Sequence, residues 1–150
     1  MGQVPRSTSY LIIGNGRLGR HLDFYLRKLK LNVQLWSRSQ SVEVLKSELK
    51  SATHVLLAIP DREIEKFVFS NADIESDTFF KKQLVHFSGA YFHKDIAGAH
   101  PLMTFSDSLY ELEQYKKIQF VVDESAPDFS ELLPGLDNAH FTLKENQKSL

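Results

Sequence analysis

Hydrophobic and polar positions alternate along the chain in blocks that predict a strand followed by a helix. Tyr10–Ile13 is an unbroken apolar run ending at Gly14, which is typical of a strand buried on both faces of a parallel sheet. Apolar residues then recur from Leu18 to Leu29 at helical spacing and form one stripe. The stretch therefore predicts a buried strand, a tight turn and an amphipathic helix.

The same order of a strand followed by a helix repeats along the first half of the chain. It predicts strands over 33–36 and 55–59, each followed by a helix, with Ser39 or Ser41 capping the first of these helices and Asp61 capping the second. The polar stretch 69–82 has no clear pattern. Later segments predict strands over 84–87, 97–100, 118–122 and 140–143 and a short helix over 128–133.

Alternation of this kind is typical of an α/β fold. We expect a Rossmann-type, mainly parallel and doubly wound sheet with helices on both faces. The first strand is expected at the centre of the sheet, with the turn after it at the carboxyl end.

The turn after the first strand carries a glycine pattern with a known physical use. Three glycines at this spacing make a tight turn, let the backbone approach a pyrophosphate and let the helix pack on the strand. The N-terminus of the helix then offers N–H groups and a positive dipole to phosphates. Because a strand precedes the pattern and a helix follows it, we interpret it as a dinucleotide-binding turn consisting of Gly14, Asn15, Gly16, Arg17, Leu18 and Gly19. The alternative is a glycine-rich turn that binds nothing.

The end of the second strand bears on the choice of cofactor. Domains that prefer NAD usually place an acidic residue there to bond the ribose 2′-hydroxyl, but this chain has Ser37, Arg38 and Ser39. Arg38 can pair with a 2′-phosphate and the serines can donate hydrogen bonds to it. The pattern favours NADP (as NADPH) as the cofactor, against the alternative of a solvated arginine at the start of a helix.

Composition narrows the classes of function. The 150 residues carry a net charge of −1, with 42% hydrophobic and 25% charged residues, as in an ordinary soluble domain. That charge favours neither nucleic acid nor an anionic membrane as a partner. The chain has no cysteine, which excludes disulfides and thiolate metal sites, and its histidines lack metal-ligand spacing. We expect a cytoplasmic protein with no metal site.

Three elements together resemble the N-terminal domain of the 6-phosphogluconate dehydrogenase-like superfamily, which includes pyrroline-5-carboxylate reductase, ketopantoate reductase and deazaflavin-dependent NADP oxidoreductases. They are the glycine turn, the Ser37–Ser39 turn and the segment 58–61. His86–Ala90 and His100–Phe105 are further similar to the His-x-Ser-Gly and His-Pro-Leu elements of a branch of NADP-dependent oxidoreductases. The resemblance covers nearly the whole chain from Tyr10 onward.

The resemblance implies roles for residues beyond the glycine turn. Ala58, Ile59 and Pro60 would line the path from ribose to nicotinamide, and Ser88, Gly89 and His100 would lie near the nicotinamide. His100 is a candidate catalytic residue that would protonate a carbonyl oxygen as hydride arrives. Ser88 is a candidate for bonding a substrate carboxylate or the nicotinamide amide. The alternatives are a structural loop histidine and a serine that caps the end of a strand.

The predicted organisation is an N-terminal tail over 1–8, an NADP-binding domain over 9–143 and the start of a helical domain over 144–150. In the resembling superfamily that helical domain covers the nicotinamide and often forms a homodimer. Only the predicted start of that domain lies within these 150 residues. We therefore expect them to bind cofactor without appreciable turnover of a small substrate. The leading hypothesis is the cofactor domain of an NADP-dependent oxidoreductase, and the alternative is a non-enzymatic NADP-binding sensor or regulatory module.

Overall fold

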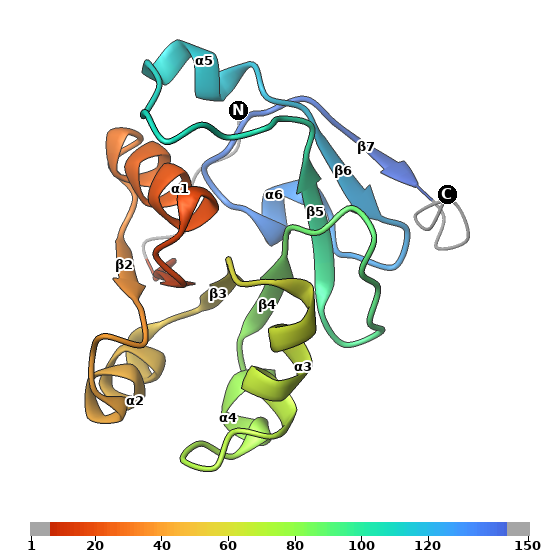
Figure 1. Cartoon of the computed structure of the whole chain (residues 1–150). Coiled ribbons are helices and arrows are strands. Elements are labelled where there is room, and N and C mark those ends of the chain that lie inside the picture. The colour runs from red at the N-terminus through yellow and green to blue at the C-terminus, as the bar shows by residue number, and fades with distance from the viewer. Residues whose placement is uncertain (1–6, 144–150) are drawn as a thin grey trace.

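The computed structural model describes residues 7–143, which form a seven-stranded sheet with helices packed against it (Figure 1). The α/β, Rossmann-type fold predicted from the sequence is confirmed. Most of the predicted tail and the whole predicted start of a helical domain, 1–6 and 144–150, lie outside the described residues. Of the tail, Ser7 and Thr8 are described, and Thr8 is buried.

The strands follow the order β2-β1-β3-β4-β5-β6-β7, and all neighbouring pairs are parallel except β5 and β6. Strand β1 lies between β2 and β3, next to an edge strand, so the prediction that it is central is wrong. Only β2 lies on one side of β1, whereas β3 to β7 all lie on the other side. No local sequence pattern determines on which side the later strands add. The strands are β1 (Tyr10–Ile13), β2 (Val33–Trp36), β3 (His54–Leu57), β4 (Gln83–His86), β5 (Ala97–Pro101), β6 (Phe120–Asp123) and β7 (His140–Leu143).

The helices largely follow the apolar stripes of the sequence. Ser41 caps α2, since its Oγ accepts a hydrogen bond from the Val44 N–H at 3.2 Å. Asp61 does not cap α3 as predicted, because it is the first helical residue and the N-cap position belongs to Pro60. Neither α4 nor α5 was predicted. The helices are α1 (Arg17–Lys28), α2 (Val42–Ser51), α3 (Asp61–Phe69), α4 (Ser76–Phe80), α5 (Leu112–Lys116) and α6 (Phe129–Leu132).

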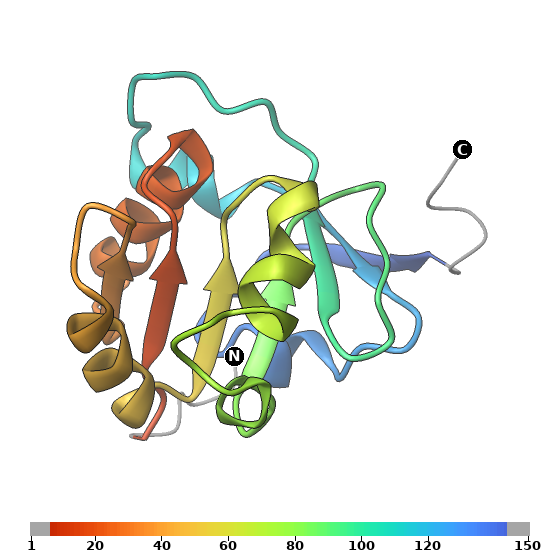
Figure 2. The same ribbon diagram turned by 60° about the horizontal axis from the view of Figure 1, so that its bottom comes forward.

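Two apolar layers, one on each face of the sheet, hold these elements together. Alternate residues of β1 point to opposite faces: Tyr10 and Ile12 join the layer beneath α1, α5 and α6, whereas Leu11 and Ile13 join the layer beneath α2, α3 and α4. Figure 2 shows α3 and α4 in front of the strands. Burial on both faces explains why β1 contains four apolar residues in succession.

A buried polar network ties α1 to the C-terminal half of the chain. The Tyr25 hydroxyl donates to Oδ1 of Asn138 at 2.6 Å. Nδ2 of Asn138 donates to the carbonyls of Tyr115 and Ile118, each at 2.8 Å. Desolvation by burial raises the pKa of Tyr25 to about 12, so its hydroxyl remains a donor at neutral pH. The network therefore links α1 to α5 and to the segment that leads into β7.

No helix within residues 7–143 is both long enough and apolar enough to cross a membrane.

Candidate functional site

The turn between β1 and α1 needs glycine at two positions for packing and leaves the third open. Gly14 has a φ of +113°, and a Cβ there would overlap the Ala58 carbonyl oxygen. A Cβ on Gly19 would overlap the Gly14 carbonyl, so the helix lies directly against the turn. A Cβ on Gly16 would meet no other atom within 4 Å. The turn therefore presents bare backbone to open space at Gly16.

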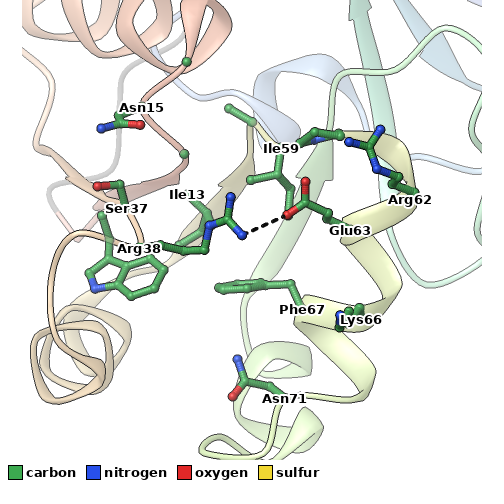
Figure 3. A pocket seen from close by; sticks show the side chains of 15 residues that line it. Ile13, Asn15, Ser37, Arg38, Ile59, Arg62, Glu63, Lys66, Phe67 and Asn71 are labelled. Carbon is green, nitrogen blue, oxygen red and sulfur yellow. Dashed lines mark ion pairs between the residues drawn. The ribbon is translucent and has the colours of Figure 1, made fainter.

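A cavity of about 720 Å³ lies above the carboxyl ends of β1, β2 and β3, and the exposed backbone of Gly16 forms part of its lining. Parallel α/β sheets bind ligands at this end of their strands. Gly16 is also the N-cap of α1, so the unpaired N–H groups of the first helical turn lie beside the cavity. The lining residues are Ile13, Gly14, Asn15, Gly16, Trp36, Ser37, Arg38, Ala58, Ile59, Pro60, Arg62, Glu63, Lys66, Phe67 and Asn71 (Figure 3).

Arg38 reaches into this cavity from the loop after β2. Its guanidinium Nη1 lies 3.8 Å from Oε1 of Glu63, and the Arg38 side chain is 88% exposed. Beside it, the hydroxyls of Ser37 and Ser39 share a hydrogen bond of 2.9 Å. The cavity thus contains a solvent-accessible cation where the sequence predicts one, together with an acid on α3 that the sequence analysis did not consider.

Arg17, the first residue of α1, is held by a different partner. Its Nε donates to Oδ1 of Asp107 at 2.7 Å, and Nη2 of Arg20 lies 3.9 Å from the same oxygen. The hydrogen bond from Arg17 lowers the pKa of the Asp107 carboxyl, which is therefore ionised at neutral pH. The loop between β5 and α5 consequently crosses the N-terminal turn of α1 with a carboxylate beside the two arginines.

Most of the predicted cofactor-binding residues come together around the cavity, and the others, except Gly89, are close neighbours of them in the chain. Leu18 packs against the layer beneath α1, and Gly19 is buried under Gly14. Arg17 and Ser39 have the partners given above, and Gly89 lies beyond the end of β4. The residues that both line the cavity and were predicted are Gly14, Asn15, Gly16, Ser37, Arg38, Ala58, Ile59 and Pro60.

The predicted catalytic residue His100 lies beside Gly89. A Cβ on Gly89 would come within 3.0 Å of the imidazole of His100, so the ring is packed against bare backbone. Nδ1 of His100 lies 3.0 Å from the Phe87 carbonyl oxygen. Because a carbonyl can only accept, Nδ1 is the donor, and Nε2 is the acceptor atom of the neutral ring.

The hydroxyl of Ser88 is already engaged in the structure. It donates to Oδ2 of Asp61 at 2.8 Å and accepts from the N–H groups of Ala90 and Tyr91 at 3.1 and 3.0 Å. Ser88 therefore joins the loop after β4 to the start of α3, and any ligand contact by its hydroxyl would share these bonds.

The cavity also contains residues that the sequence analysis missed. Four of them lie on α3, where spacings of three and four residues place them on one face of the helix. That spacing is a signal the sequence did carry, because α3 directly follows the loop predicted to run along the cofactor. The missed residues are Ile13, Trp36, Arg62, Glu63, Lys66, Phe67 and Asn71.

Within residues 7–143, no group of three or more histidine and acidic side chains is placed to hold a metal ion. His86 is fully buried, and its Nε2 lies 3.9 Å from Oδ2 of Asp123.

Solved structures share the fold at low sequence identity. An imine reductase from Myxococcus stipitatus, a V8 variant in complex with NAD+, has a TM-score of 0.66 and 15% identity over 94% of this chain and 56% of its own. An NADH-preferring ketol-acid reductoisomerase from an uncultured archean has a TM-score of 0.64 and 11% identity, covering 96% and 54%. A Streptomyces aurantiacus imine reductase has a TM-score of 0.63 and 14% identity, covering 92% and 56%.

The chain thus spans little more than half the length of these neighbours. No model of a known protein family matches it, and no curated protein matches it in sequence. At these identities the likeness establishes the Rossmann-type fold.

Proposed function

We propose that this chain binds a nicotinamide dinucleotide, with NADP preferred over NAD, and serves as the cofactor domain of an oxidoreductase. The observation that carries the proposal is the cavity of about 720 Å³. It brings together the open backbone of Gly16, the N-terminus of α1 and the exposed guanidinium of Arg38. An anionic, elongated ligand with a pyrophosphate and a second phosphate matches this arrangement.

The residues present fit each part of such a ligand. The pyrophosphate would lie over Gly16, where a side chain would have open space and the backbone is accessible. The 2′-phosphate would pair with Arg38 and accept hydrogen bonds from Ser37 and Ser39. The dinucleotide would then run past Ala58–Pro60 toward the loop after β4. When bound, the cofactor supplies or accepts the hydride.

His100 is the residue we propose for proton transfer. The Phe87 carbonyl fixes Nδ1 as the donor, which leaves Nε2 to exchange a proton with a carbonyl oxygen or imine nitrogen. Gly89 allows the ring to lie close to the backbone after β4. Ser88, together with Asp61, would orient the substrate or the nicotinamide amide from the neighbouring loop.

The fold neighbours support oxidoreduction as the reaction class, since they are described as imine reductases and a ketol-acid reductoisomerase. One of them is in complex with NAD+ and another prefers NADH. The preference for NADP in this chain therefore rests on Arg38 and its two serines rather than on the neighbours.

A titration of the chain with NADPH and NADH tests the binding function, with Arg38→Ala as the informative variant. A charge-assisted hydrogen bond contributes about 1.5–3 kcal/mol, so NADPH should bind about tenfold or more tightly than NADH. Arg38→Ala should remove most of that difference, while Arg27→Ala, at the far end of α1, should leave it unchanged. Equal affinities of the unaltered chain for the two dinucleotides would refute the NADP assignment.

The reaction class is tested by screening small keto acids and imines for NADPH oxidation. Oxidation that depends on His100 supports the proposed proton transfer. Oxidation of NADPH by the 150-residue chain at an ordinary enzymatic rate would exclude the alternative, a non-enzymatic NADP-binding module, and would show that the expectation of binding without turnover is wrong.

A further inference from the structure

The cavity proposed to bind the dinucleotide contains an acid that faces Arg38 from a different element. Glu63 belongs to α3, and its Oε1 lies 3.8 Å from Nη1 of Arg38. Figure 3 shows the two side chains pointing toward each other across the cavity. The carboxylate is the more sheltered partner, with 32% of the Glu63 side chain exposed against 88% for Arg38. The arginine thus has an anionic partner within the chain itself.

The chemistry of the two dinucleotides differs at the position that Arg38 is proposed to read. A 2′-phosphate needs the guanidinium as its counter-ion, and a carboxylate beside the same guanidinium competes for it and repels the phosphate. A 2′-hydroxyl carries no charge and needs no cation. Glu63 therefore acts against NADP much more strongly than against NAD.

We propose that Glu63 is a specificity-determining residue, which limits the preference for NADP by competing with the 2′-phosphate for Arg38. The inference rests on the proposed function, because it assigns a role to a side chain within that same binding site. The end of β2 has no acidic residue, and in this structure α3 places the acid Glu63 beside that position.

The charges around Glu63 determine how large the effect should be. Arg62 and Lys66, on the same helix, also line the cavity. Removing the carboxylate therefore leaves this part of the cavity lined by cations. Lys66 lies three residues after Glu63, a spacing that places side chains next to each other on a helix surface, and charges within about 10 Å interact at ordinary ionic strength. Because the Arg38 side chain is largely exposed and the Glu63 side chain is about one-third exposed, the effect is that of a surface ion pair, a change of about twofold to fivefold in affinity.

The test uses Glu63→Gln, which removes the charge and keeps the shape of the side chain. The matched control is Glu131→Gln, an exposed residue of α6, which packs on the opposite face of the sheet from the cavity. NADPH and NADH are titrated against each chain at about 0.05 M and about 0.5 M salt. Thermal unfolding confirms that each variant is folded.

For Glu63→Gln we expect NADPH to bind about twofold to fivefold more tightly at low salt and NADH to change by less than about twofold. The gain should shrink at high salt, and Glu131→Gln should show none of it. In an Arg38→Ala background most of the gain should disappear, because the guanidinium for which Glu63 competes is gone and only direct repulsion of the phosphate is left.

An unchanged ratio of the two affinities in Glu63→Gln overturns the inference while leaving the proposed function intact. A gain for NADPH that persists in full without Arg38 also overturns it, since competition for the guanidinium would then play no part. If the unaltered chain binds neither dinucleotide, the proposed function is refuted and the inference with it.

Discussion

Replacing Gly16 with valine is expected to abolish dinucleotide binding while the chain stays folded. The Gly16 backbone is extended, with φ of −73° and ψ of −165°, a region that valine adopts readily. A Cβ there meets no atom within 4 Å. Valine is a poorer N-cap than glycine, but it also reduces the entropy of the unfolded chain. The two effects oppose each other, so we expect a net change in unfolding free energy within about 1 kcal/mol.

The loss of binding should be much larger than the change in stability. The branched side chain would occupy the space above the turn where the pyrophosphate is proposed to lie. Losing two charge-assisted hydrogen bonds to phosphate, at about 1.5–3 kcal/mol each, weakens binding at least about 100-fold.

Gly19→Ala provides the contrast within the same turn. A Cβ at Gly19 overlaps the Gly14 carbonyl, and overpacking of this kind costs about 1–3 kcal/mol or more. For a chain of this length, each 1 kcal/mol lowers Tm by about 2–4 °C. Gly19→Ala should therefore lower Tm by several degrees, whereas Gly16→Val should shift Tm by no more than about 2–4 °C in either direction.

The only tryptophan of the sequence, Trp36, lines the cavity, so its fluorescence reports NADPH binding directly. Each variant is titrated with NADPH and melted in parallel. Wild-type affinity in a folded Gly16→Val chain would refute the reasoning, since it would mean that the glycines of this turn serve packing alone.

Three further perturbations test other contacts. Asp107→Asn releases Arg17 from its carboxylate partner and should tighten NADPH binding by about twofold to fivefold; an unchanged Kd would mean that Arg17 does not act on the ligand. Tyr25→Phe leaves the buried Oδ1 of Asn138 without its tyrosine donor and should cost about 1–3 kcal/mol; an unchanged Tm contradicts this. Burial lowers the pKa of His54, so the unfolded chain takes up its proton first and stability falls as pH drops below about 6.5. His54→Gln should reduce that fall, and an identical decline of Tm with pH in the variant would show that His54 is not its source.

Local patterns in the sequence were enough to predict the fold class and the part of the candidate site formed by the glycine turn and the loop after β2. The apolar run of β1 and the glycines after it need nothing beyond neighbouring residues, because burial on both faces and a positive φ are imposed at single positions. The place of Arg38 and its neighbouring serines beside the cavity was also predictable, since the end of β2 has a fixed place in a sheet of this kind.

Only the tertiary structure decided which residues face one another across the cavity. Glu63 meets Arg38 because α3 packs on the same face of the sheet as α2, and Arg38 lies in the loop that leads from β2 into α2. Neither the loop nor α3 encodes that meeting by itself. The position of β1 near one edge likewise depends on where β4 to β7 add to the sheet. Contacts between distant segments are set by packing and topology, whereas periodicity reports only the local conformation and the buried side of each element.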